Sequence, residues 1–136
     1  MAETIRQVDY YYVQTPNKAG EAARALAVFR DAGINLLAFS GFPSGRRAQL
    51  DFIPQDPQGF VQAARKARLK LSAKKSGFLI QGEDRVGAIG DVLAKLAAAK
   101  INVTAVDAVS AGEGRFGAIL WVKPPDRKRA AKALGV

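Results

Sequence analysis

The sequence predicts an α+β protein of two ferredoxin-like βαββαβ units, each an antiparallel sheet with helices on one face. Two observations carry this prediction: an internal repeat of 67 residues, and the same order of strand and helix patterns in both copies. In addition, hydrophobic residues make up 49% of the 136 residues, which is enough for a packed core and argues against disorder. The expected division is residues 1–72 for the first unit and 73–136 for the second.

The repeat appears when the sequence is shifted by 67 residues against itself, and it needs no gap over most of each unit. Identical residues then coincide at Gln14 and Gln81, Gly20 and Gly87, Ile34-Asn35 and Ile101-Asn102, Gly45 and Gly112, and Pro57 and Pro124. We infer a duplication. An asparagine at the start of an apolar strand is unusual, so its recurrence asks for a structural or chemical reason.

The first unit begins with the β-branched and aromatic run VDYYYVQ (8–14), which predicts a strand. After the loop TPNKAG, the spacing of apolar residues predicts a helix, and Gly33 suits the left-handed position after its end. Strands are expected at 35–42 and 48–54 around the turn PSGRR. Asp56 caps a second helix with Pro57 in its first turn, and LKLS (69–72) predicts a closing strand.

The second unit repeats this order. We expect a strand at 76–82, a helix striped by Ile89, Val92, Leu93 and Leu96, strands at 103–110 and 116–122, and a helix opened by KPPD. The chain then reaches Val136 without a closing strand, so strand 76–82 is expected to leave an open edge. Pairing of that edge predicts a homodimer.

Composition excludes several kinds of chemistry. The chain has no histidine and no cysteine, which argues against a triad hydrolase, a conventional zinc site and disulfides. No Walker motif is present, and GEDRVGAIG lacks the acidic residue that a dinucleotide site requires. We therefore expect a non-enzyme without catalytic residues, metal or cofactor. The absence of a signal peptide and of a membrane-length apolar run predicts a cytoplasmic protein without a membrane partner.

The segments PNKAGEAARALAVFRDAGINLLAF and EDRVGAIGDVLAKLAAAKINVTAV resemble the ACT domain, a regulatory module of amino-acid-metabolic enzymes. The resemblance covers nearly the whole chain as two tandem copies. Both copies depart from the family's Pro-Gly pair, with Ala19 and Val86 at the proline position. The resemblance implies a regulatory protein that binds a free amino acid or a similar small zwitterion between the first loop of one unit and the second strand of a neighbouring unit.

The residues that this resemblance implies for binding lie in two loops and at two asparagines. They are Asn17, Lys18, Gly20 and Asn35 in the first unit, and Asp84, Arg85, Val86, Gly87, Ala88, Ile89 and Asn102 in the second. Backbone N–H groups at the helix starts, from Gly20 to Ala22 and from Gly87 to Ile89, suit a carboxylate. Asp84, or Asn17 more weakly, suits an ammonium. The second unit is the better candidate, because Asp84 is charged and Glu21 would repel a carboxylate.

Structural readings of the same residues stand beside this one. An asparagine after a helix can cap carbonyl groups or shape a turn, and each glycine can serve tight helix–sheet packing. Tyr11 is expected in the core, with Tyr10 and Tyr12 on the other sheet face or at a subunit contact.

The alternative partner is an anion such as nucleic acid, because 21 Lys and Arg against 12 Asp and Glu give a net charge of +9. The βαββαβ order is also that of the RNA-recognition motif, and GRFGAILWV resembles its third-strand signature, but Ala118 stands at the central stacking position. Basic runs at Arg65–Lys75 and Arg127–Lys132 are more typical of solvated helix faces. Nucleic acid therefore ranks second.

Overall fold

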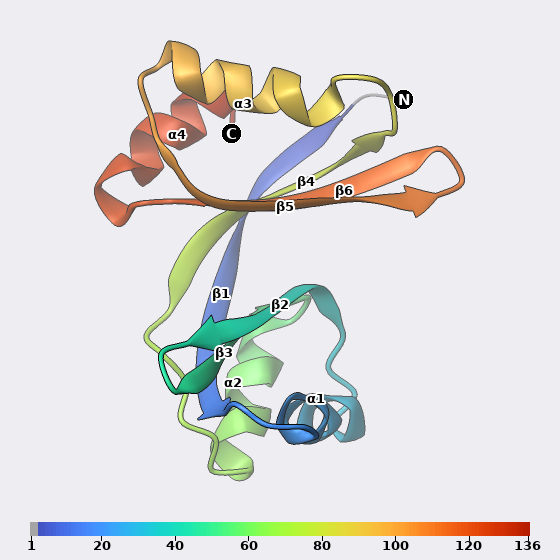
Figure 1. The fold of residues 1–136 in the computed structure, drawn as a ribbon, viewed down its shortest axis with the longest axis vertical. Coiled ribbons are helices and arrows are strands. Elements are labelled where there is room, and N and C mark those ends of the chain that lie inside the picture. Colours follow the sequence, from blue (N-terminus) through green and yellow to red (C-terminus); the bar gives the residue numbers. More distant parts are fainter. Residues whose placement is uncertain (1–2) are drawn as a thin grey trace. The chain divides into compact units, whose positions relative to one another are not determined.

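The computed structural model describes residues 3–136 and confirms the α+β class. Its elements are β1 (Thr4–Pro16), α1 (Glu21–Asp31), β2 (Leu36–Ser44), β3 (Arg47–Pro54), α2 (Pro57–Lys66), β4 (Lys75–Glu83), α3 (Ala88–Ala98), β5 (Val103–Gly112), β6 (Arg115–Val122), a 3₁₀ turn (Pro124–Asp126) and α4 (Arg127–Leu134) (Figure 1). The strand pairs β1–β3, β2–β3, β4–β6 and β5–β6 are antiparallel. No helix among residues 3–136 is long and apolar enough to cross a membrane.

The chain forms two compact units. The N-terminal unit is Asp9–Lys75, and the C-terminal unit combines residues 3–8 with Ser76–Val136. In each unit two helices lie on one face of the sheet, α1 with α2 and α3 with α4 (Figure 1). The structure thus places residues 3–8 with the C-terminal unit, whereas the expected division at residue 72 kept them in the first unit.

The C-terminal unit has the strand order β1-β4-β6-β5, in which the first half of β1 is the neighbour of β4. Thr4 Oγ1 donates to the carbonyl of Gln81 at 3.4 Å, and a Cβ on Gly82 would lie 3.3 Å from Glu3 Cα. Ile5 packs on the core of this unit. The expectation of a missing strand and an open edge at 76–82 is therefore wrong, because the start of the chain supplies that strand.

The N-terminal unit has the order β2-β3-β1, completed by the second half of β1. The expected strand 69–72 is absent as a regular strand. Ser72 N–H donates to the carbonyl of Tyr12, and Ser72 Oγ accepts from Tyr12 N–H, each at 2.9 Å. A side-chain oxygen thus replaces the carbonyl of a regular ladder, while Leu69 and Leu71 pack on the core.

The two cores differ in composition. Aromatic rings fill the N-terminal core, where the centroid of Phe29 lies 4.2 Å from that of Phe60 and 5.1 Å from that of Phe52. The expectation that Tyr11 belongs to this core is confirmed, and Tyr10 is equally buried, with 8% of its surface exposed. The C-terminal core is mainly aliphatic, with fully buried Ile80, Val92, Leu96 and Leu120 beside Phe78.

The register of the strands corrects the gapless repeat in one place. Phe52 pairs with Tyr11 and Phe39, and its counterpart Leu120 pairs with Phe78 and Val106. Phe52 and Leu120 lie 68 positions apart, whereas the other counterparts lie 67 apart. The additional residue is in the second hairpin, where the pairing is irregular between Ser110 and Gly112.

Candidate functional site

Each unit has a short loop between its first strand and first helix, residues 17–20 (the N-terminal loop) and 84–87 (the C-terminal loop). Both end in a left-handed glycine, Gly20 with φ 90° and Gly87 with φ 81°, and neither helix start has a side-chain cap. A Cβ on either glycine would meet no atom within 4 Å. The left-handed backbone conformation, rather than tight packing, therefore explains these glycines.

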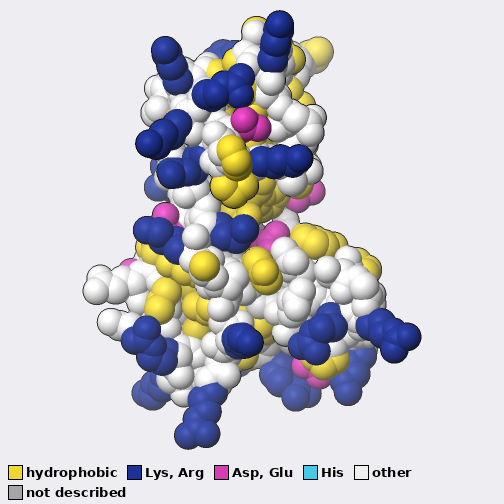
Figure 2. Space-filling model, turned by 90° about the vertical axis from the view of Figure 1, so that its left-hand side faces the viewer, with side chains coloured by type: hydrophobic (Ala, Val, Ile, Leu, Met, Phe, Trp, Pro, Cys, Tyr) yellow, Lys and Arg dark blue, Asp and Glu magenta, His cyan; other side chains and the backbone are white. Residues whose placement is uncertain are grey.

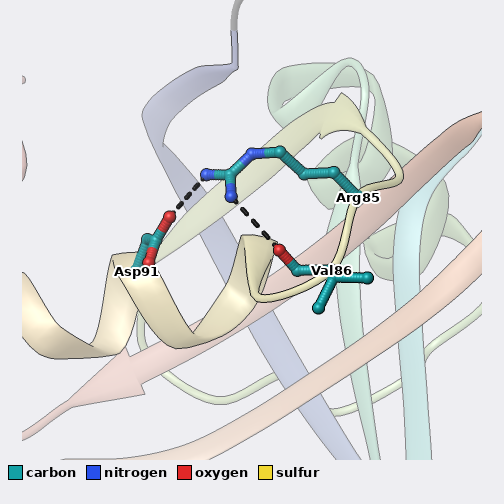
Figure 3. Close-up of polar contacts among 3 residues, drawn as sticks. All are labelled: Arg85, Val86 and Asp91. Carbon is teal, nitrogen blue, oxygen red and sulfur yellow. Dashed lines mark hydrogen bonds and ion pairs between the residues drawn. The ribbon is translucent and has the colours of Figure 1, made fainter.

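The C-terminal loop is held by an ion pair. Arg85 Nη2 lies 2.6 Å from Asp91 Oδ2 in the first turn of α3, and Arg85 Nη1 lies 3.4 Å from the carbonyl of Val86 (Figure 3). The hydrogen bond to Asp91, aided by the charge of that carboxylate, raises the pKa of Arg85. The side chain of Val86 is fully exposed. An acidic side chain already lies at this helix start, where a ligand carboxylate was expected.

Asp84 joins the same loop to the β5–β6 hairpin. Its carboxylate accepts from Ser110 Oγ at 2.9 Å, and its N–H donates to the carbonyl of Gly114 at 2.8 Å. The N–H of Ala88, one of the three expected to receive a carboxylate, donates to the carbonyl of Arg85 at 3.2 Å. Much of the polar capacity of this loop is thus used within the C-terminal unit.

The N-terminal loop borders a groove of about 290 Å³. Apolar side chains from α1, β2 and β3 line most of it, and they are Ala22, Phe39, Phe42, Pro43, Ala48 and Leu50. Phe39 and Phe42 are 37% and 43% exposed, which is unusual for two phenylalanines on one strand.

The polar lining of this groove comes from the N-terminal loop and its two flanks. It consists of Thr15, Asn17, Lys18 and Glu21. The side chain of Glu21 is only 15% exposed, and it forms an ion pair at 4.0 Å with Arg24, whose own side chain is 78% exposed. The groove therefore combines an apolar wall with one positive and one negative side chain.

Asn35 and Asn102 lie at the far ends of their units' first helices. Helix α1 has 11 residues and so spans about 16 Å between Gly20 and the turn that leads to Asn35. Asn35 Nδ2 donates to Gln55 Oε1 at 3.0 Å, and Asn35 lines a separate hollow with Leu26, Phe29 and Ile34. Within a unit, the structure does not bring the asparagine together with the loop residues.

Reasoning from the sequence missed the apolar half of the groove. Phe39 and Phe42 looked like strand residues, and only the register of β2 on β3 brings them beside the N-terminal loop. The signal in the sequence was the run FSGFP, in which a glycine and a proline interrupt an apolar strand. Among residues 3–136, no cluster of three acidic side chains could hold a metal ion.

Comparison with protein families matches residues 78–136 to the ACT domain model. The match to the ACT domain begins within β4 and runs to the end of the chain, so it covers most of the C-terminal unit.

Solved structures share the fold of the whole chain. A protein from Bacteroides thetaiotaomicron has a TM-score of 0.78 at 17% identity, over 94% of this chain and 88% of that one. The regulatory subunit of aspartate kinase from Thermus thermophilus, in a ligand-free form, has a TM-score of 0.65 at 16% identity, over 98% of this chain and 94% of that one. No curated protein matches the sequence. At such identities the likeness concerns the fold.

Proposed function

We propose that this chain is a non-enzymatic regulatory protein that binds a free amino acid or a similar small zwitterion. The match of residues 78–136 to the ACT domain model supports a regulatory role that depends on a small molecule. The similar fold of a regulatory subunit of aspartate kinase supports the same role. We further propose that the N-terminal unit is a second ACT-like domain, because it repeats the element order and the left-handed glycine before its first helix.

The groove beside the N-terminal loop is the main support for placing the binding site there. It offers a concave surface with apolar and charged lining, as small-molecule sites do, and its 290 Å³ suits a compact ligand. Asn17, Lys18 and Gly20 lie along this loop, so three of the residues expected to bind remain in the proposal. We therefore favour the N-terminal loop over the C-terminal loop, where Asp84 and Arg85 already have partners.

A thermal-shift screen of the twenty amino acids tests this function. A ligand at a hundred times its dissociation constant should stabilise the protein by about 2.7 kcal/mol, which is a clear increase in melting temperature. If no amino acid at millimolar concentration moves the melting curve, the proposed function fails.

A second candidate is binding of a polyanion, favoured by one specific observation. The segment Arg65–Lys75 holds six basic residues and no acidic one, and none of the six has an ion-pair partner among residues 3–136. Figure 2 shows many more basic than acidic side chains on the face that it draws. Phe116 and Trp121 are buried, so base stacking of the RNA-recognition type has no platform there. Nucleic acid that co-purifies, seen as absorbance at 260 nm above that at 280 nm, would support this candidate.

A further inference from the structure

We propose that the groove of the N-terminal unit selects an α-amino acid with an apolar side chain, and that Glu21 receives its ammonium group. This inference rests on the proposed function and specifies its ligand class. It also reverses the expectation that Glu21 only repels a ligand, because a carboxylate at this position attracts the opposite end of a zwitterion.

The side chain of Glu21 is mostly buried and only weakly paired. Its side chain is 15% exposed, so most of the side chain is shielded from water. Among residues 3–136 its one ion pair is at 4.0 Å, with an arginine whose side chain is 78% exposed. A carboxylate on a mostly buried side chain with one weak ion pair gains from a further cation. A ligand ammonium in the groove would supply that cation.

Lys18 provides the complementary charge at the same end of the groove. The N–H of Glu21 donates to the carbonyl of Lys18 at 3.4 Å, so a tight turn brings the two residues together. Both line the groove. An α-amino acid carries its ammonium and carboxylate on one carbon, so two opposite side-chain charges next to each other match it. The N–H groups at the start of α1 add donors for the carboxylate.

The remainder of the groove favours an apolar side chain on the ligand. Phe39, Phe42, Pro43 and Leu50 all line it. At Gly41 a Cβ would lie 3.3 Å from Leu50 Cδ2 and 3.7 Å from the Phe39 ring, so the absence of a side chain lets these apolar groups lie close to the backbone of β2. Thr15 is 8% exposed, and its hydroxyl already donates to the carbonyl of Pro16. An acidic or basic ligand side chain would lose water on this wall without gaining a partner.

The test is calorimetric titration of the full chain with leucine, phenylalanine, aspartate, lysine and isoamylamine, which is leucine without its carboxylate. Leucine or phenylalanine should bind at least about tenfold more tightly than aspartate or lysine. Isoamylamine should bind more weakly than leucine, because it cannot engage Lys18. Glu21→Gln should weaken binding of the apolar amino acid by about tenfold, since a charge-assisted bond becomes a neutral one. Phe42→Ala should weaken it severalfold.

Glu113→Gln is the matched control, because it removes one negative charge at an exposed turn of the C-terminal unit. It should leave the affinity unchanged. Tighter binding of aspartate or lysine than of leucine and phenylalanine would overturn the inference while the proposed function stands. Unchanged affinity in both Glu21→Gln and Phe42→Ala would overturn the assignment to this groove. Absence of binding by all twenty amino acids would instead remove the proposed function itself.

Discussion

Asn35 has a hydrogen-bonding partner whose residue type is not repeated in the C-terminal unit. Asn35 pairs with Gln55 through its side chain at 3.0 Å, and its carbonyl accepts from Gln55 N–H at 2.9 Å. These bonds fasten the start of β2 to the residue before the Asp56 cap. By the register of β3 and β6 the counterpart of Gln55 is Lys123, 68 residues later, and a lysine side chain has no oxygen that could accept from the asparagine amide. The interpretation of the asparagine as a structural residue therefore fits Asn35. At Asn102 the equivalent side-chain partner is missing from the sequence.

We predict that Asn35→Ala lowers the free energy of unfolding by about 0.5–1 kcal/mol, because an exposed hydrogen bond is lost. Asn102→Ala is the matched control and should change stability by less. Urea denaturation measures both. Gln55→Ala should cost as much as Asn35→Ala, and the double variant should cost little more than either one. Fully additive losses would show that the two side chains do not interact.

Tyr10 gives a prediction for alkaline pH. Burial, with the nearby charge of Asp51 and the effect of Tyr12, raises the pKa of Tyr10 to about 12. The unfolded chain loses this phenol proton near pH 10, whereas the folded protein keeps it. The stabilisation is therefore complete below pH 10 and is lost as the pH rises toward 12. In urea denaturation, the parent should lose more stability over this range than Tyr10→Phe. Parallel pH profiles would contradict the prediction.

The helix α2 shows how one side chain fixes the start of an element. Asp56 Oδ1 accepts from Gly59 N–H at 3.1 Å, as the sequence predicted for its cap. Asp56→Ala should therefore cost about 1 kcal/mol of stability. Asp126 precedes α4 without a capping bond and only pairs with Arg129 at 3.2 Å, so Asp126→Ala should cost a few tenths of a kcal/mol. Chemical denaturation of both variants decides this, and equal losses would refute a specific role for the cap.

The sequence predicted most elements because apolar periodicity and turn residues are local. It failed where a distant partner decides the outcome. Residues 4–7 contain one apolar residue, Ile5, so nothing local marks them as a strand, and their place beside β4 depends on the tertiary fold. LKLS has a strand pattern, yet the Ser72 hydroxyl takes the hydrogen bond that a ladder carbonyl would accept. The apolar lining of the groove was missed for the same reason, because it depends on contacts between segments that are distant in the sequence.

At the scale of the whole molecule, the duplication conserves the frame while the surfaces diverge. Each unit keeps the left-handed glycine and the helix pair, but the loop of the C-terminal unit is closed by Arg85 and Asp91, and that of the N-terminal unit borders a groove. The candidate residues of both loops came from the resemblance to the ACT domain, and the repeat placed them at equivalent positions. The repeat could not predict which of the two loops borders a groove, because the groove depends on side chains from β2 and β3.

The strand order also leaves β5 at an edge, and this changes the basis of the expected homodimer. Strand β5 has 10 residues, most of them exposed, and Asp107 is its one charged residue. Long edges with few charges invite pairing with another chain. We expect a homodimer in which β5 pairs with its copy. Val109 on β5 is 68% exposed, so Val109→Lys should place a charge in this contact and give a monomer.

Val136→Lys is the control. It adds the same charge at an exposed valine outside the strands and should leave the dimer intact. Light scattering across a range of concentrations measures the mass. A monomeric mass for the parent at every concentration would refute the dimer, and loss of the dimer in both variants would show that net charge, rather than the edge of β5, controls assembly.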